Sequence, residues 1–169
     1  MRVFSFCVAL VLGVGAALAV LFHYAGGWGV PYFSFTTERG STCVNTFTGF
    51  RCDQLTLDDV RFFSGVDLPG STRVVTSHYR STHDYQLEAQ LEVPPAGARA
   101  AQLALVETFG RCVSGHPSPL SGQALSGVCV LANDTEVTES GVPDSRVFVV
   151  ATGLRADKSR VVSLSVRSR

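Results

Sequence analysis

The chain has 169 residues, and its 14 lysines and arginines balance 14 aspartates and glutamates, so the formal net charge is zero. A balanced charge excludes the strongly basic surface of a nucleic-acid-binding protein and provides no long-range attraction for acidic substrates. Lys158 is the single lysine among these cations, a bias that is typical of a high-GC genome, so we expect a bacterial protein.

An apolar stretch at residues 3–22 carries no charged side chain. An α-helix rises about 1.5 Å per residue, so twenty such residues cover about 30 Å, the thickness of a bilayer core. The sequence therefore predicts a transmembrane signal-anchor within residues 1–24.

The residues that flank this stretch predict its orientation. Arg2 is the only charged side chain before it, and Glu38 is the next charged residue after it. Because positive charge tends to remain in the cytoplasm, we expect a single pass through the cell membrane with a cytoplasmic amino terminus. The aromatic residues that follow suit the headgroup layer of the bilayer, and they are Tyr24, Trp28 and Tyr32.

A cleaved signal peptide is the alternative. Ala17-Leu18-Ala19 fits the small-x-small cleavage pattern, and cleavage after Ala19 would release a secreted protein. The apolar run continues through Phe22, however, and exceeds the roughly 7–15 apolar residues of a signal peptide, which favours a retained anchor. Both interpretations place the rest of the chain outside the cytoplasm.

Two further regions follow the anchor. Residues 25–40 contain three glycines and Pro31 near their start, which predicts a short juxtamembrane spacer. The 129 residues from 41 to 169 are enough for one extracytoplasmic domain with its own hydrophobic core.

Five cysteines are present, and Cys7 lies within the apolar stretch. The even number outside it indicates two disulfides in an oxidising compartment, with three possible connectivities. We expect the sequence neighbours to pair, as Cys43–Cys52 and Cys112–Cys129. A zinc site is the alternative, but structural zinc prefers cysteines about two to four residues apart, whereas eight and sixteen residues separate these pairs. No metal is therefore predicted.

The first predicted elements are a hairpin and a short helix. Residues 42–51 are rich in threonine and aromatic residues, which predicts a β-hairpin that turns at Gly49. Thr56 can cap a helix that ends at Gly65, and Asp58 and Asp59 suit its positive end. Together with a turn that begins at Asp67, these roles explain the aspartates without a pair of catalytic carboxylates.

A strand pair and the long helix come next. Residues 73–79 favour a strand, and residues 85–93 alternate apolar and polar side chains without an error, which predicts a strand with one buried face. Pro94 and Pro95 end it, and residues 96–109 show the apolar stripe of an α-helix capped by Gly110.

After a loop at residues 111–127 the pattern predicts three more strands, at 128–131, 146–152 and 160–166, with turns at 133–135 and 142–145. The total is five or six strands with one long and one short helix, joined mostly by short connections. This order indicates an α+β fold, an antiparallel sheet with a helix packed on one face.

A series of structural features marks residues 55–110. They are a short helix ending in Gly65-Val66, the Leu68-Pro69 turn, the strand start at His83-Asp84-Tyr85 and the helix start at Val93-Pro94. In these features the segment, about a third of the chain, resembles one found in uncharacterised actinobacterial membrane-anchored extracytoplasmic proteins and lipoproteins. The lipobox of the lipoprotein members is missing. The resemblance implies location and fold, and no named activity.

The candidate reactive residues are few. His78, His83 and Asp84 are the best metal or acid–base group, but residues 78 and 83 of a continuous strand face opposite sides of the sheet. They converge only across a turn near residues 80–82, and hydrogen bonding around Asp84 is the simpler interpretation. His116 lies between serines in a proline-containing loop, yet no Gly-x-Ser-x-Gly motif accompanies it.

We therefore expect a membrane-anchored, non-enzymatic module that binds an envelope or membrane partner and needs no cofactor, metal or nucleic acid. The alternative is a small extracytoplasmic enzyme, metal-dependent or hydrolytic, that uses His78, His83 and Asp84, with His116 as a further candidate.

Overall fold

The computed structural model describes residues 2–134 and 145–168, with side chains from Leu10 onward. The side chain of Cys7 lies outside these ranges, and the turns predicted at 133–135 and 142–145 lie partly outside them. The elements in chain order are α1 (Arg2–Ala25), β1 (Ser34–Thr36), β2 (Thr42–Thr46), β3 (Gly49–Cys52), α2 (Leu57–Ser64), β4 (Arg73–Ser81), β5 (Tyr85–Val93), the 3₁₀-helix η1 (Pro95–Gly97), α3 (Ala98–Phe109), β6 (Ser126–Ala132), β7 (Arg146–Leu154) and β8 (Arg160–Ser168).

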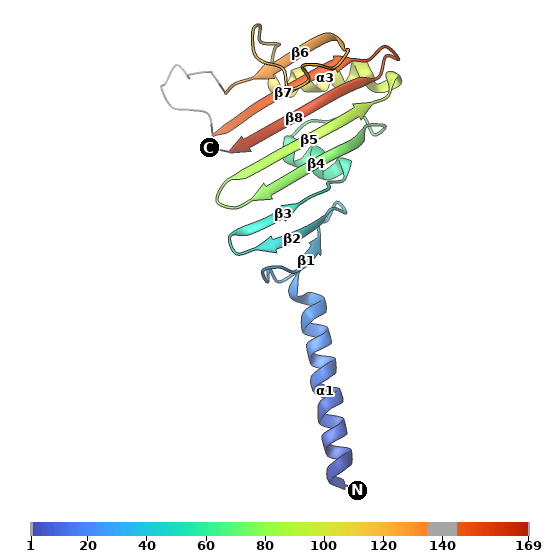
Figure 1. The fold of residues 1–169 in the computed structure, drawn as a ribbon, viewed down its shortest axis with the longest axis vertical. Coiled ribbons are helices and arrows are strands. Elements are labelled where there is room, and N and C mark those ends of the chain that lie inside the picture. Colours follow the sequence, from blue (N-terminus) through green and yellow to red (C-terminus); the bar gives the residue numbers. More distant parts are fainter. Residues whose placement is uncertain (1, 135–144, 169) are drawn as a thin grey trace.

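Over the described residues, the strands form one eight-stranded antiparallel sheet in the order β1-β2-β3-β4-β5-β8-β7-β6 (Figure 1). α3 carries the chain from β5 to the far edge at β6, and β7 and β8 then return toward the centre, so β8 pairs with β5. The α+β fold with an antiparallel sheet is confirmed. The predicted number of strands was too low, and β1 lies within residues 25–40, the stretch predicted as a spacer.

The alternation predicted for residues 85–93 is confirmed on β5. Leu87, Leu91 and Val93 are almost fully buried, whereas the intervening glutamines and Glu88 are exposed. The buried face packs with the matching residues of β8, and both helices of the domain lie on this side of the sheet (Figure 1). Burying each such leucine stabilises the fold by roughly 1.5–3 kcal/mol.

A buried arginine attaches α3 to this face. The Arg160 side chain on β8 donates from Nε to the Ala98 carbonyl at 2.9 Å, and from Nη1 to Gln102 Oε1 at 2.7 Å and Thr152 Oγ1 at 3.0 Å. Burial lowers the pKa of the Arg160 guanidinium. A guanidinium group that is removed from water is costly unless its N–H groups find acceptors in the protein. These three bonds therefore hold the start of α3 over β7 and β8.

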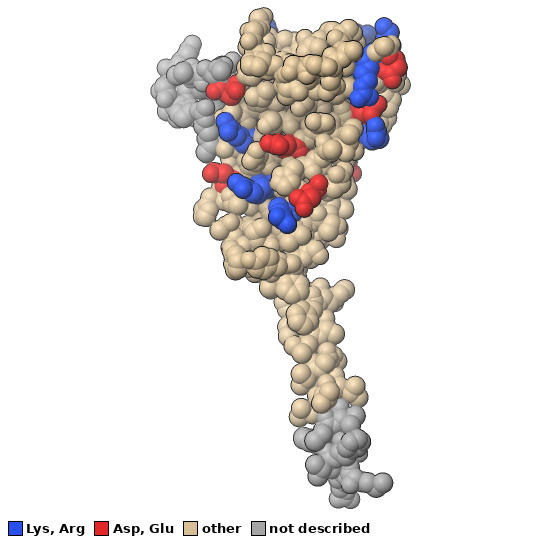
Figure 2. All heavy atoms as spheres, viewed as in Figure 1, with Lys and Arg blue, Asp and Glu red and all other residues tan. Residues whose placement is uncertain are grey.

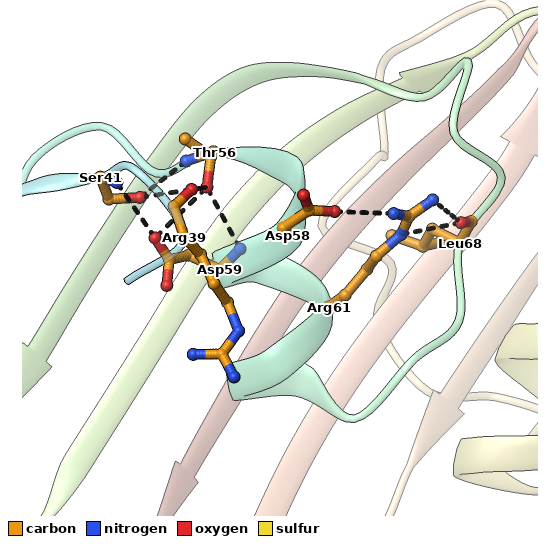
Figure 3. A network of polar contacts seen from close by, with 7 residues as sticks. All are labelled: Arg39, Ser41, Thr56, Asp58, Asp59, Arg61 and Leu68. Atoms are coloured by element: carbon orange, nitrogen blue, oxygen red, sulfur yellow. Dashed lines mark hydrogen bonds and ion pairs between the residues drawn. The ribbon is translucent and has the colours of Figure 1, made fainter. Parts of the chain in front are cut away.

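The predicted cap of α2 is confirmed and belongs to a larger network (Figure 3). Thr56 Oγ1 accepts a hydrogen bond from the Asp59 amide at 3.2 Å, and Gly65 ends the helix in a left-handed conformation. The Asp59 carboxylate, 1% exposed, also accepts bonds from Thr37 Oγ1 at 2.6 Å and the Ser41 amide at 3.2 Å. Asp59 therefore joins α2 to the turn between β1 and β2.

Both predicted disulfides are present. Cys43–Cys52 links β2 to β3 within the main core, and both residues are 0% exposed. Cys112–Cys129 links the loop after α3 to β6. Each bond closes a short loop and restricts the unfolded chain.

α1 extends away from the β1 edge of the sheet (Figure 1). Its apolar side chains are exposed, for example Val11 at 67%, Leu12 at 68% and Phe22 at 62%. Among the residues described with their side chains, which for α1 begin at Leu10, no helix is long and apolar enough to cross a membrane.

Candidate functional site

The structure separates the first group of candidate residues. His78 lies on β4, and its Nδ1 is 3.2 Å from Asp53 Oδ1, with both side chains more than half exposed. His83 lies in the turn beyond Ser81, the last residue of β4, and Ser81 is itself about 10 Å from His78 along the strand. His83 is exposed and makes no polar contact with a described residue.

Asp84 has a structural role in this turn. Its carbonyl accepts the Thr82 amide at 2.8 Å, and its Oδ1 lies 3.5 Å from Ser168 Oγ, which in turn accepts the Tyr85 amide at 2.8 Å. These contacts hold the start of β5 against the end of β8. Within the described part of the chain, no three His, Cys, Asp or Glu side chains are placed to hold a metal ion.

His116 has a partner that sequence reasoning missed. Its Nε2 is 2.9 Å from Asp134 Oδ1, and its Nδ1 is 3.0 Å from the Pro117 carbonyl oxygen. Both nitrogens face acceptors and donate to them in the protonated ring, so the Pro117 carbonyl first and the Asp134 carboxylate second raise the pKa of His116. Neither nitrogen is left free to accept a proton from Ser114, which argues against a serine nucleophile here.

The contact with Asp134 follows from the second disulfide. Cys112–Cys129 brings the loop beside β6, and the Val113 amide donates to the Val130 carbonyl at 2.7 Å. This pairing carries His116 toward the residues that follow β6. The expected Cys112–Cys129 disulfide is the feature of the sequence that could have indicated that His116 lies near Asp134.

The face of the sheet opposite the helices carries polar side chains on four adjacent strands. We call this surface the open face, because no described element covers it. Its side chains are all exposed or half-exposed, and they are Arg51, Thr76, His78, Arg80, Gln86, Glu88, Gln90, Ser163, Ser165 and Arg167. Figure 2 views this side of the molecule and shows charged groups of both signs spread across it.

A loop marks one border of the open face. Leu120, in the loop between α3 and β6, is 3% exposed and packs with apolar residues of β6, β7 and β8 that point to the same side. The adjoining concavity has a volume of about 370 Å³ and is lined mainly by Thr76, His78, Gln90 and Pro119. The apolar part of this sheet side is thus covered, whereas the polar part is accessible.

Three arginines cross the open face in one row, which we call the arginine row: Arg51, Arg80 and Arg167. Arg51 is opposite Arg80, Arg80 is opposite Gln86, and Gln86 is opposite Arg167 in the strand register. The guanidinium groups of these three residues form no ion pair or hydrogen bond with a described residue. Like charges directly opposite each other in a sheet are destabilising, so this row has a cost within the isolated domain.

Two other arginines of the sheet region, unlike those of the arginine row, form ion pairs. Arg73 pairs with Glu92, and Arg155 Nη1 is 2.8 Å from the other oxygen of the same carboxylate. Glu88 lies on the open face two residues after Gln86 on β5, and it accepts a hydrogen bond from Gln86 Nε2 at 2.8 Å. The sequence did not reveal the row because only the strand register brings its members together.

No family model matches this chain, and neither a curated protein nor a solved structure matches it.

Proposed function

We propose that this protein is a membrane-anchored, extracytoplasmic, non-enzymatic module that binds an acidic segment of an envelope or membrane protein on its open face. The observation that carries the proposal is the arginine row, whose three guanidinium groups have no ion-pair or hydrogen-bond partner among the described residues and lie on a sheet surface that no described element covers. Carboxylates of a partner would relieve the repulsion between Arg51 and Arg80 through charge-assisted hydrogen bonds.

The apolar stretch at residues 3–22 supports the anchor. α1 is a continuous 24-residue helix that projects from the domain, and its side chains are exposed from Leu10 to Tyr24. An apolar surface of this extent is unfavourable in water, because each square ångström costs about 25 cal/mol, and it is favourable within a bilayer. The two disulfides support an oxidising, extracytoplasmic location.

The composition of the open face favours a protein partner over a uniform polyanion. Glu88 lies beside the arginine row and would repel a continuous anionic polymer. The serines of β8 and the glutamines of β5 offer neutral donors and acceptors, which suit a polypeptide with mixed side chains. The enzyme alternative has no comparable observation in its favour, because His78, Asp84 and His116 lie in separate contacts.

Binding of an acidic peptide that alternates glutamate with serine and glutamine tests the proposal. Full-length protein in nanodiscs should bind the labelled peptide, and the R51Q/R80Q variant should bind it about three- to tenfold more weakly, since two exposed charge contacts are lost. Arg99→Gln is the matched control, because Arg99 is exposed on α3 at the other side of the sheet. No binding, or equal weakening by R99Q, would contradict the proposal, and tighter binding of polyphosphate than of peptide would contradict a protein partner.

A further inference from the structure

The base of the domain, next to α1, has no charged side chains over a long stretch of the chain. Between residues 23 and 37, and again between residues 40 and 50, there is no Asp, Glu, Lys or Arg. In Figure 2 the lowest part of the domain shows neither blue nor red atoms. Arg39, in the turn between these segments, lies over the Phe62 ring of α2 at 3.7 Å from its centroid.

Exposed aromatic rings gather on this charge-free base. Tyr24 and Trp28 are stacked with ring centroids 6.0 Å apart, and they are 54% and 64% exposed. Tyr32 and Phe47 form an edge-to-face pair at 5.3 Å and are 75% and 77% exposed. We call these four residues the aromatic base. Phe47 comes from the tip of the β2–β3 hairpin. The fold therefore brings a residue that is distant from the apolar stretch in sequence to the three aromatic residues that follow the stretch closely.

The aromatic base is attached firmly to the sheet. Asn45 on β2 is buried, and its Nδ2 donates to the Gly26 carbonyl at 2.7 Å. Its backbone carbonyl accepts the Tyr32 amide at 2.8 Å, and its amide donates to the Phe33 carbonyl at 3.0 Å. A Cβ at Gly26 would lie 1.8 Å from the Ser34 carbonyl oxygen, so only glycine allows this approach. The end of α1 is therefore fixed in direction relative to β2.

Tyr32 adopts an uncommon backbone conformation to present its ring. Its φ of 69° lies in the left-handed region, which is unfavourable for a tyrosine. The Tyr32–Phe47 pair remains largely exposed, so burial within the domain does not compensate this strain. Aromatic rings with a polar tip prefer the headgroup layer of a bilayer, where one end is apolar and the other is wet.

We propose that the aromatic base, including the β2–β3 hairpin tip, inserts into the headgroup layer of the membrane that α1 spans. This inference rests on the proposed anchor and adds a second contact between the domain and lipid. Because α1 and β2 are rigidly joined, the contact fixes the tilt of the sheet. The open face is then held upright at a constant height above the bilayer.

Tryptophan quenching by lipids brominated near the headgroup tests the inference. The wild-type chain has one tryptophan, so the W28F/F47W variant carries a single reporter at the hairpin tip. The wild type and the variants are compared as full-length proteins in phosphatidylcholine vesicles. The matched control is W28F/F62W, because Phe62 is 58% exposed and lies on α2, away from the aromatic base. We expect loss of emission from Trp28 in the wild type and from position 47, and unchanged emission from position 62.

The possible results separate this inference from the anchor on which it rests. Quenching of Trp28 without quenching at position 47 would overturn the hairpin contact and leave the anchor intact. Quenching at neither site would overturn the anchor as well. Equal quenching at positions 47 and 62 would mean that the domain lies flat on the bilayer, which also contradicts the inference.

Discussion

Among single residues, His116 has the environment with the clearest consequence for pH. Its pKa is raised by the Pro117 carbonyl and by Asp134, the acidic residue that faces it. The stabilisation from its charged form is therefore complete below the unfolded-state pKa of about 6.5 and is lost as pH rises through the folded-state pKa.

The expected result is that the loop at residues 113–117 becomes less protected in amide hydrogen exchange as pH rises, after correction for the intrinsic exchange rate. His116→Asn should remove this pH dependence, whereas His83→Asn should leave it unchanged, because His83 makes no polar contact with a described residue. A pH dependence that persists in H116N would show that another group is responsible.

Asp59 shows how far single residues can be predicted from sequence. Its place near the start of α2 followed from local rules, since Thr56 caps the helix and acidic residues suit the first turn. Its bonds to Thr37 and Ser41 did not, because those residues are 22 and 18 positions away in the chain. The helix cap could be predicted from the three-residue spacing of Thr56 and Asp59, whereas the long-range contacts depend on the tertiary fold.

At the scale of elements, the strength of the sequence pattern determined the accuracy of the prediction. β5 was predicted with its observed bounds because nine residues alternate without interruption. β1 was missed because its three residues follow a glycine-rich stretch and are too few to show a period. α3 begins two residues later than predicted, because Pro95 first forms a 3₁₀ turn.

The second disulfide provides a prediction about the loop that covers β6 and β7. The C112S/C129S variant should lose about 3 kcal/mol of stability on the loop-entropy estimate, because the bond closes a loop with a sequence separation of 17. Leu120 lies in this loop and depends on its position for burial. We therefore expect amides near Leu120 to lose protection in hydrogen exchange under native conditions, while β5 remains protected.

The C43S/C52S variant is the comparison, since both of its cysteines lie in the main core. In that variant we expect the loss of protection to be centred on β2 and β3. Unchanged protection near Leu120 in C112S/C129S would show that packing alone holds the loop.

At the scale of the whole molecule, the sequence predicted the components of the fold better than their arrangement. The α+β fold and both disulfides followed from periodicity, cysteine number and spacing. The position of β8 between β5 and β7 did not, because strand order depends on how the chain returns after α3. The arginine row depends on this strand order, so it was not visible as a pattern in the sequence. Three residues of the aromatic base were expected at the headgroup layer from the sequence, and the fold adds only Phe47 to them.

The central claim is that the open face holds a protein partner at the membrane, and site-specific photo-crosslinking in native membranes tests it most directly. A photoreactive amino acid at Gln90, which lines the concavity of the open face, should give one discrete protein adduct. The yield of the adduct should fall several-fold in the R51Q/R80Q background, and no adduct should form from Ala100, an exposed position on α3. The absence of an adduct at Gln90, together with an adduct from Ala100, would contradict the claim.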